Sequence, residues 1–169
     1  YLGSENATGD TLEHGAGRNL LQGGRLAVYR GRLFVSGFAD ANFRQTVRFS
    51  NIGDMRPGAK GKNKDIIVQG WPTNNVIHLV EGDPSDITAM SVFRDNLVIF
   101  KRRSITLLNG TSIEDMAVVL VDQSVGHVGL TPPVGVQTDQ GPFLFFVGED
   151  GFYAWNGSTQ YLSGPIERT

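Results

Sequence analysis

Three short apolar segments, separated by two tight polar turns, lie in the middle of the chain. Residues 89–110 read Ala-Met-Ser-Val-Phe-Arg-Asp-Asn-Leu-Val-Ile-Phe-Lys-Arg-Arg-Ser-Ile-Thr-Leu-Leu-Asn-Gly. The apolar runs are too short for helices and are rich in residues that favour strands. The expected turns are at residues 95–96 and 101–103, and the final Asn-Gly accepts positive φ. The pattern predicts most of a four-stranded antiparallel sheet, the size of one propeller blade.

This unit is repeated along the chain. The three copies are residues 27–36, 91–100 and 135–146, the last one looser by a residue or two. Anchored on Leu33, Leu97 and Leu144, the copies are 64 and 47 residues apart. Propeller blades repeat at roughly 40–50 residues. The longer first interval contains a basic loop, residues 56–64, which accounts for the excess as an insertion.

The repeat predicts the fold class and its limits. Each copy leaves one face apolar and needs neighbours to bury it. The chain holds about three to three and a half such units, whereas a closed propeller usually has at least four. We therefore predict an all-β protein, an antiparallel β-propeller. Either missing residues complete the ring, or the sheets pack in a more open or sandwich-like arrangement. The start at Tyr1, without Met, suggests a processed chain or a piece of a longer one.

The chain divides into two regions by composition. Residues 1–24 form a Gly-rich N-terminal arm, and residues 25–169 hold the blades. The glycines of the arm lack the preceding strand and the third Gly of a dinucleotide-binding fingerprint, which favours a flexible arm over a phosphate-binding loop. Among the blade segments, residues 117–121 read Ala-Val-Val-Leu-Val. This fully apolar run predicts a strand at the centre of a sheet.

Composition excludes several classes of protein. The 169 residues carry no Cys, so no disulfide framework and no thiol chemistry is available. The net charge of −2 argues against a broad basic face that coats nucleic acid. The sequence contains no run of 18 apolar residues, so it predicts no membrane-spanning segment.

Several segments together resemble a known family. They are residues 47–54, 86–110, 145–158 and 163–166, within a region that spans about residues 25–166. The blade with Phe-Arg-Asp, Phe-Lys and Ser-Ile, followed by the blade with Glu-Asp-Gly-Phe-Tyr, is similar to the β-propeller virion proteins of tailed bacteriophages. This family includes tail nozzle, tail hub and packaged-DNA-stabilising proteins.

The resemblance implies a structural role in the virion. It implies a subunit of a tail or neck ring that continues the DNA channel and helps to retain and deliver packaged DNA. The implied partners are copies of the chain itself, neighbouring tail or portal-adaptor proteins, and the passing genome DNA. The family has no catalytic residues, so we expect a protein that is not an enzyme and that needs no cofactor.

Two basic clusters are the candidate contacts with DNA or with other subunits. Arg56, Lys60, Lys62 and Lys64 lie in the inserted loop, while Lys101, Arg102 and Arg103 form a hairpin turn. For the loop we favour contact with another subunit, because a long insertion in a repeat is often its binding face. For the turn, a solvated hairpin tip is the favoured interpretation.

Trp71 is the candidate interface anchor. It lies in a Gly-Trp-Pro turn, where Pro disfavours burial in a sheet, and Trp is common at interface hot spots.

The sequence offers no convincing catalytic or metal site. His14, His78 and His127 are isolated and lack a ligand-type partner at metal-binding spacing. The pairs 114–115 and 149–150 are carboxylates, but turns explain them more simply than glycosidase chemistry does. The alternative function is a carbohydrate-binding propeller module of a tail fibre, with aromatic-lined pockets once per blade. A propeller hydrolase ranks last.

Overall fold

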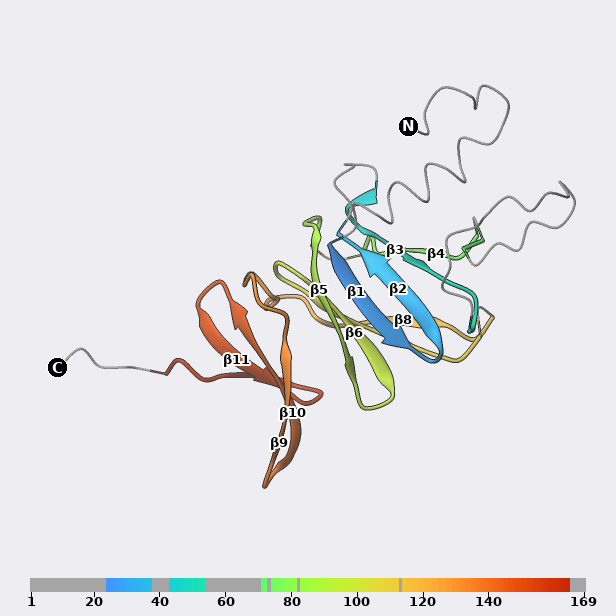
Figure 1. Ribbon diagram of the computed structural model, residues 1–169. Helices are drawn as coiled ribbons and strands as arrows, with labels where there is room; N and C mark the ends of the chain where they lie inside the picture. The colour runs from blue at the N-terminus through green and yellow to red at the C-terminus, as the bar shows by residue number, and fades with distance from the viewer. Residues whose placement is uncertain are drawn as a thin grey trace, which may run out of the picture. The chain divides into compact units, whose positions relative to one another are not determined.

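The structure is a computed structural model of the chain, and it describes residues 24–37, 43–53, 71–72, 74–81, 83–112 and 114–164. These residues form twelve strands and no α-helix, which confirms the prediction of an all-β protein (Figure 1). Within these ranges, no helix is long and apolar enough to cross a membrane. The chain divides into two compact units, Tyr1–Leu79 and Val80–Thr169.

The first unit contains one four-stranded sheet. Its antiparallel strands follow chain order, β1 Arg25–Tyr29, β2 Arg32–Ser36, β3 Thr46–Phe49 and β4 Val76–His78. Arg30 and Gly31 connect β1 to β2 with φ angles of 49° and 73°. Positive φ at both central residues defines the hairpin turn whose twist matches that of the strands.

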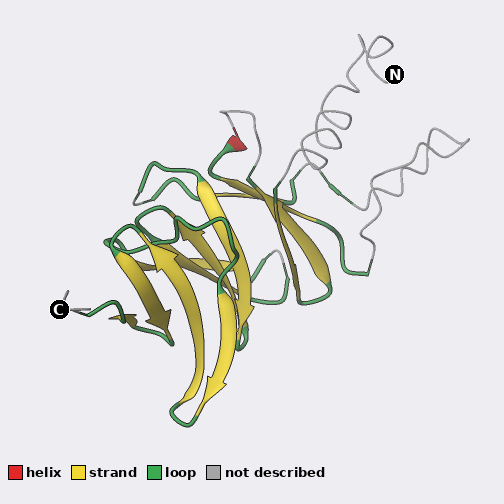
Figure 2. Cartoon of the chain, turned by 60° about the vertical axis from the view of Figure 1, so that its left-hand side comes forward, coloured by secondary structure: helices red, strands yellow, loops and turns green. Residues whose placement is uncertain are grey.

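The second unit contains two more four-stranded antiparallel sheets. The second sheet has β5 Ile87–Phe93, β6 Asn96–Lys101, β7 Ile105–Asn109 and β8 Ala117–Asp122 in chain order. The third sheet has β9 Val134–Thr138, β10 Gly141–Gly148, β11 Gly151–Trp155 and β12 Thr159–Tyr161, again in chain order. These strands are three to eight residues long, and Figure 2 draws several strands of the chain as curved arrows.

The first hairpins of the first two sheets match in detail. Each has a two-residue turn that begins with an arginine of positive φ, 49° at Arg30 and 53° at Arg94. Each guanidinium lies over the preceding aromatic ring, 5.7 Å from the Tyr29 centroid and 5.2 Å from the Phe93 centroid. The predicted repeat between these two copies is therefore confirmed at the level of backbone and side chain.

The third copy is shifted relative to the predicted alignment. Its turn lies between the paired residues Thr138 and Gly141, as Phe93 and Asn96 flank the turn of the second copy. By this register Pro142, not Leu144, is equivalent to Leu97, so the spacing is 45 residues rather than 47. The predicted anchor was wrong by two residues, because the apolar content of β10 hides the position of the turn.

Each sheet has two faces that can be named by this register. We call front the face that carries the last residue of the sheet's first strand, and back the opposite face. The three reference residues are Tyr29, Phe93 and Thr138. Because side chains alternate along a strand and paired residues share a face, the names apply to every residue of the three sheets.

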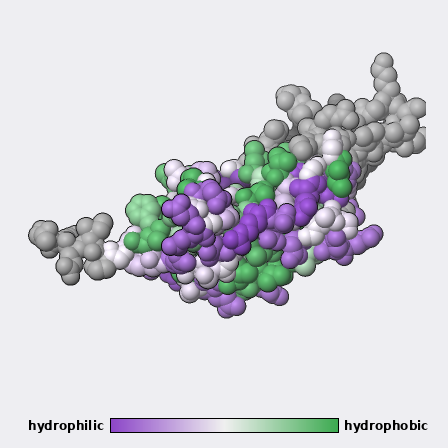
Figure 3. Space-filling model, turned by 90° about the horizontal axis from the view of Figure 1, so that it is seen from below, coloured by the Kyte–Doolittle hydropathy of each residue, from purple (hydrophilic) through white to green (hydrophobic). Residues whose placement is uncertain are grey.

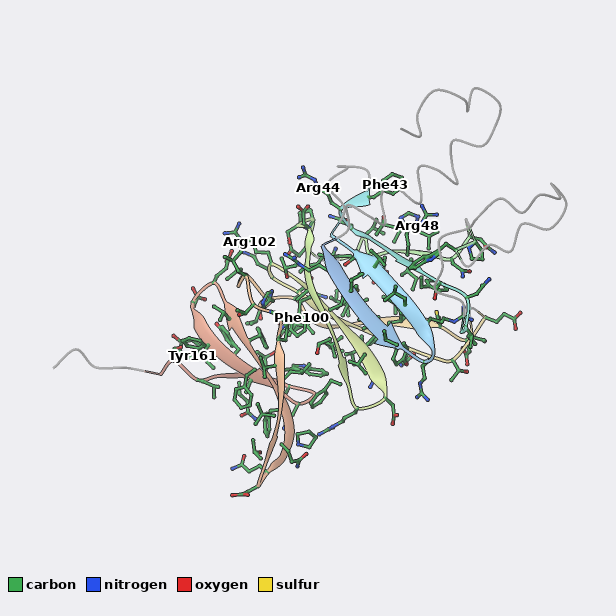
Figure 4. The ribbon with its side chains drawn as sticks, in the orientation of Figure 1. Phe43, Arg44, Arg48, Phe100, Arg102 and Tyr161 are labelled. Carbon is green, nitrogen blue, oxygen red and sulfur yellow. The ribbon has the colours of Figure 1, made fainter. Side chains whose placement is uncertain are left out.

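The front face of the second sheet packs on the back face of the third. Their shared core contains Ala89, Phe93, Val98, Phe100, Ile105, Leu144, Phe146, Tyr153 and Trp155. The ring centroid of Phe100 is 5.0 Å from that of Phe146, and Phe93 meets Trp155 edge to face at 5.4 Å. Phe100 is fully buried in this core (Figure 4). Burial of one such side chain contributes about 1.5–3 kcal/mol.

The connection from β8 to β9 fastens the second and third sheets together. The His127 backbone N–H donates to the Lys101 carbonyl at 2.8 Å, and the Val128 N–H donates to the Val147 carbonyl at 2.9 Å. A Cβ at Gly126 would lie 2.1 Å from the Lys101 carbonyl oxygen, so only glycine fits this approach. At the end of β8, the Asp122 carboxylate accepts a hydrogen bond from the Thr159 hydroxyl at 2.5 Å.

The prediction that residues 117–121 form a central strand is wrong. β8 lies at the edge of the second sheet, and Val118, Val119 and Val121 are exposed. Valine favours extended backbone as well as burial, so an apolar run can mark a strand without marking its position in the sheet. The predicted arm, apart from residue 24, lies outside the described residues.

Candidate functional site

The basic turn between β6 and β7 is held by hydrogen bonds on several sides. Lys101 ends β6 and is 1% exposed, and its Nζ donates to the Asp83 carbonyl at 2.7 Å. The Arg103 N–H donates to the Asp83 carboxylate at 2.7 Å, and the Arg102 N–H donates to the Ser85 hydroxyl at 3.0 Å. Residues 83–85 therefore brace the turn from outside the sheet.

The pKa values of Lys101 and Asp83 reflect this bracing. Burial lowers the pKa of the Lys101 ammonium, and the nearby Asp83 carboxylate offsets only part of that effect. Burial acts to raise the pKa of Asp83, but hydrogen bonds from Ser85 and Arg103 outweigh it and leave that pKa below its ordinary value. Asp83 is thus an ionised structural carboxylate at neutral pH.

The two arginines of the turn share one carboxylate of the third sheet. Arg102 Nε lies 2.5 Å from Glu149 Oε1, and Arg103 Nε lies 2.9 Å from Glu149 Oε2. These hydrogen bonds lower the pKa of Glu149. Arg102 is at the tip of its sheet (Figure 4), and the corresponding tip of the third sheet carries Glu149. We call Arg102, Arg103 and Glu149 together the clasp. Because two cations share one carboxylate, the clasp has a single excess positive charge.

The candidate residues of the turn therefore differ in what they can contact. Arg102 and Arg103 are 63% and 65% exposed, so their outer faces can meet a partner while they hold Glu149. Lys101 is buried and cannot reach a phosphate in solution without leaving the Asp83 carbonyl. The three cations are adjacent in the sequence, but the structure does not place them on one surface.

The other candidates lie in the first unit. Arg56, Lys60, Lys62 and Lys64 fall outside the described residues, so their contact role stays a prediction. Trp71 is 9% exposed and packs against Val35, Leu33 and Phe43. Its ring belongs to a small core of the first unit, which leaves little of it for another subunit, and its role as an interface anchor stays a prediction.

A set of arginines in the first unit was missed by the sequence analysis. The described part of this unit contains Arg25, Arg30, Arg32, Arg44 and Arg48, and no Asp or Glu. Figure 4 labels Arg44, which precedes β3, and Arg48, which lies within β3. An excess of positive charge favours contact with polyanions or acidic protein surfaces.

Two of these arginines are buried. Arg32 is 6% exposed, donates from Nη1 to the Ser50 carbonyl at 2.9 Å and lies over the Phe49 ring, while its Nε has no hydrogen-bond partner. Arg48 is 8% exposed, and burial lowers its pKa. Burial of a cation carries a desolvation cost, and the lowered pKa of Arg48 reflects it.

The excess of positive charge in the first unit can be read from the sequence when the charges of each unit are counted separately. Tyr1–Leu79 has ten Lys and Arg against six Asp and Glu, a net charge of +4. Val80–Thr169 has five against eleven, a net charge of −6. The small total of −2 concealed this separation, because the two units nearly cancel each other.

The histidines and carboxylate pairs have structural partners. His127 is buried, with Nε2 2.7 Å from the Thr131 carbonyl oxygen, and His78 Nδ1 lies 3.2 Å from the Thr46 hydroxyl. Hydrogen bonds from Ser112 and Thr111 lower the pKa of Asp115 to about 2, so this group is no proton donor at neutral pH. In the part of the chain that the structure describes, no cluster of three His, Asp or Glu could hold a metal. His14 lies outside that part.

No known family model matches this chain, and no curated protein matches it.

Proposed function

We propose that this chain is a non-enzymatic structural protein of a tailed-phage virion, a subunit of a tail nozzle or neck ring. In this role it continues the DNA channel and helps to retain and deliver packaged DNA. Its partners are copies of itself, neighbouring tail or portal-adaptor proteins and the passing genome. Three successive four-stranded sheets with strands in chain order support a propeller arrangement of blades.

The observation that carries the proposal is the charge of the first unit. The unit as a whole has a net charge of +4, and Arg30 and Arg44 among its described residues are exposed. A channel that passes DNA needs attraction to phosphates without base-specific contacts, and arginine side chains supply it. Arginines that bind phosphates in this way release the counterions condensed on the DNA. The affinity for DNA must therefore fall as the salt concentration rises.

Binding of duplex DNA tests this role. Fluorescence anisotropy with a 30-bp duplex should give a Kd of about 10⁻⁴–10⁻⁶ M near physiological salt, weakening as salt rises. Arg30→Gln should weaken binding severalfold. The matched control is Arg94→Gln, because Arg94 has the same turn position and ring contact but lies in the acidic unit. Equal effects of the two variants, or no binding at low salt, would refute the DNA role.

Localisation needs a separate test. Mass spectrometry of purified virions should detect the chain in fixed copy number, and electron microscopy should place it in the tail or neck. Its absence from purified particles would remove the virion role even if DNA binding were found.

The carbohydrate-binding alternative is less well supported. In the described ranges the exposed aromatic residues Phe152 and Tyr161, 61% and 51% exposed, both belong to the third sheet. A glycan platform repeated once per blade would place such rings on all three sheets. We therefore keep the structural role as the proposed function.

A further inference from the structure

The front face of the third sheet is apolar and partly exposed, although Phe143 and Ala154 on it are buried. Val134, Val136 and Phe152 are 56%, 41% and 61% exposed, with Phe145 and Val147 half-buried between them. The strand pairs Val134–Phe145, Val136–Phe143 and Phe152–Val147 place these side chains on one face. Apolar surface is visible among the described residues in Figure 3. A contiguous face of this kind, without charged side chains, marks an interaction surface.

The second sheet shows how such a front face is covered. Its own front face carries Val98 and Phe100, which are fully buried against the back face of the third sheet. By the hairpin register, Phe143 and Phe145 of the third sheet are equivalent to Val98 and Phe100. The exposed front face therefore repeats a surface that already receives the back face of a neighbouring sheet within this chain.

The first sheet exposes apolar residues on its back face. Leu26 and Val28 are 61% and 58% exposed, and they pair with Val35 and Leu33 on the same face. Trp71 and Phe43 pack beside Leu33 and Val35, so the apolar surface left open lies along β1. The chain thus offers one open front face and one partly open back face, on different units.

The charges of the two units favour contact between unlike faces. The open back face belongs to the unit of net charge +4 and the open front face to the unit of net charge −6. Contact between two front faces would bring two acidic units together, whereas contact of front with back brings opposite charges together. Complementary charge speeds association and selects the partner.

We propose that these two faces form a head-to-tail interface between copies of this chain. The front face of the third sheet of one copy packs on the back face of the first sheet of the next. The smallest assembly in which both faces of each copy are covered is a dimer with two identical junctions. This interface rests on the faces and charges alone, not on the virion role.

The mass in solution is the first test. Sedimentation equilibrium of the 169-residue chain should give twice the monomer mass of 18.4 kDa. Phe152→Arg alters the front face and Leu26→Glu alters the back face, and each should raise the dimer Kd about tenfold or more. The matched controls are Leu130→Arg and Leu130→Glu, because Leu130 is 99% exposed and belongs to neither face. Circular dichroism must show that all four variants keep the all-β fold.

A mixing experiment distinguishes the arrangement. The Leu26→Glu chain keeps an intact front face and the Phe152→Arg chain an intact back face, so an equimolar mixture should restore the dimer. Its second junction would place the introduced carboxylate opposite the introduced guanidinium. Contact between two front faces would give a different result. Phe152→Arg would then break the dimer, Leu26→Glu would leave it intact, and mixing would not restore it. That result would overturn the proposal. A monomer at about 100 μM, or a larger assembly, would overturn it as well.

Discussion

The two units of this chain treat their charges in opposite ways. In the second unit, Lys101 is braced by residues 83–85, and Glu149 holds Arg102 and Arg103. In the first unit, the described residues include five arginines and no carboxylate. The β1–β2 and β5–β6 hairpins each have an arginine of positive φ at the turn, but they lie in two different electrostatic settings.

The difference indicates which unit is built to meet partners. Charges that are paired within a unit contribute to its own stability and offer little to a ligand. An excess of one sign of charge attracts a partner of the opposite sign, and Tyr1–Leu79 carries an excess of positive charge. The first unit is therefore the better candidate for contact with an anion or an acidic surface.

The largest expected effect tests the scaffold. Phe100→Ala should destabilise the second unit by about 3–5 kcal/mol, because Phe100 is fully buried and packs against Phe146 across the two sheets. Urea unfolding followed by Trp155 fluorescence in a Trp71→Phe background measures it, since each unit has one of the two tryptophans. Phe152→Ala, on the exposed front face, is the control. Equal losses for both variants would show that the shared core does not hold the unit.

A second pair of variants compares buried cations directly. Lys101→Met should destabilise its unit by about 1–3 kcal/mol, because it removes the hydrogen bond to the Asp83 carbonyl and the charge beside Asp83. Arg48→Met should be neutral or stabilising, because burial of the Arg48 charge disfavours the folded state. Urea midpoints from Trp155 and Trp71 measure the two effects. A large loss for Arg48→Met would mean that this charge is already satisfied.

Acid should affect the second unit more than the first. The folded pKa values of Asp83, Asp115 and Asp122 lie below their ordinary value of 3.8, and that of Asp115 is about 2. Because the unfolded chain binds these protons first, their stabilisation is present above pH 4 and is lost as the pH falls towards 2. The Trp155 urea midpoint should therefore fall with acid before the Trp71 midpoint.

A variant isolates one contribution to the acid loss. Hydrogen bonds from Thr159, Ser124 and Val125 hold the pKa of Asp122 down against the opposing effect of burial. Asp122→Asn should therefore flatten the pH dependence of the Trp155 midpoint. An unchanged slope, or a Trp71 midpoint that falls first, would reverse the comparison of the two units.

Much of the fold could be predicted from local sequence. The alternation of apolar residues and the tight turns located the hairpins of residues 27–36 and 91–100 because side-chain period and turn chemistry are local properties. The position of β8 at a sheet edge could not be read from its valines, because strand order depends on pairing between distant segments. The register of Pro142 was missed for a local reason, because the apolar content of β10 hides the position of its turn.

The candidate site was harder to predict for a physical reason. Lys101, Arg102 and Arg103 are adjacent in the sequence, but their hydrogen bonds come from Asp83 and Glu149. Those partners lie 18 to 47 residues away, so the sequence could not separate a structural cation from an available one. Composition taken for the whole chain concealed the opposite charges of its units, which a count by half would have shown.

The smallest expected effect concerns the clasp between the second and third sheets. Glu149→Gln removes the carboxylate that holds Arg102 and Arg103, whose side chains are 63% and 65% exposed. Exposed ion pairs contribute little to stability, and salt screens them strongly at about 1 M. The Trp155 urea midpoint should therefore shift less than for Phe100→Ala or Lys101→Met, and the shift should vanish in about 1 M NaCl. A shift as large as that of Lys101→Met, and one that salt does not reduce, would show that the tips are rigid parts of the scaffold. In that case Arg102 and Arg103 are committed to Glu149, and the second unit has no cation at this tip to offer a partner.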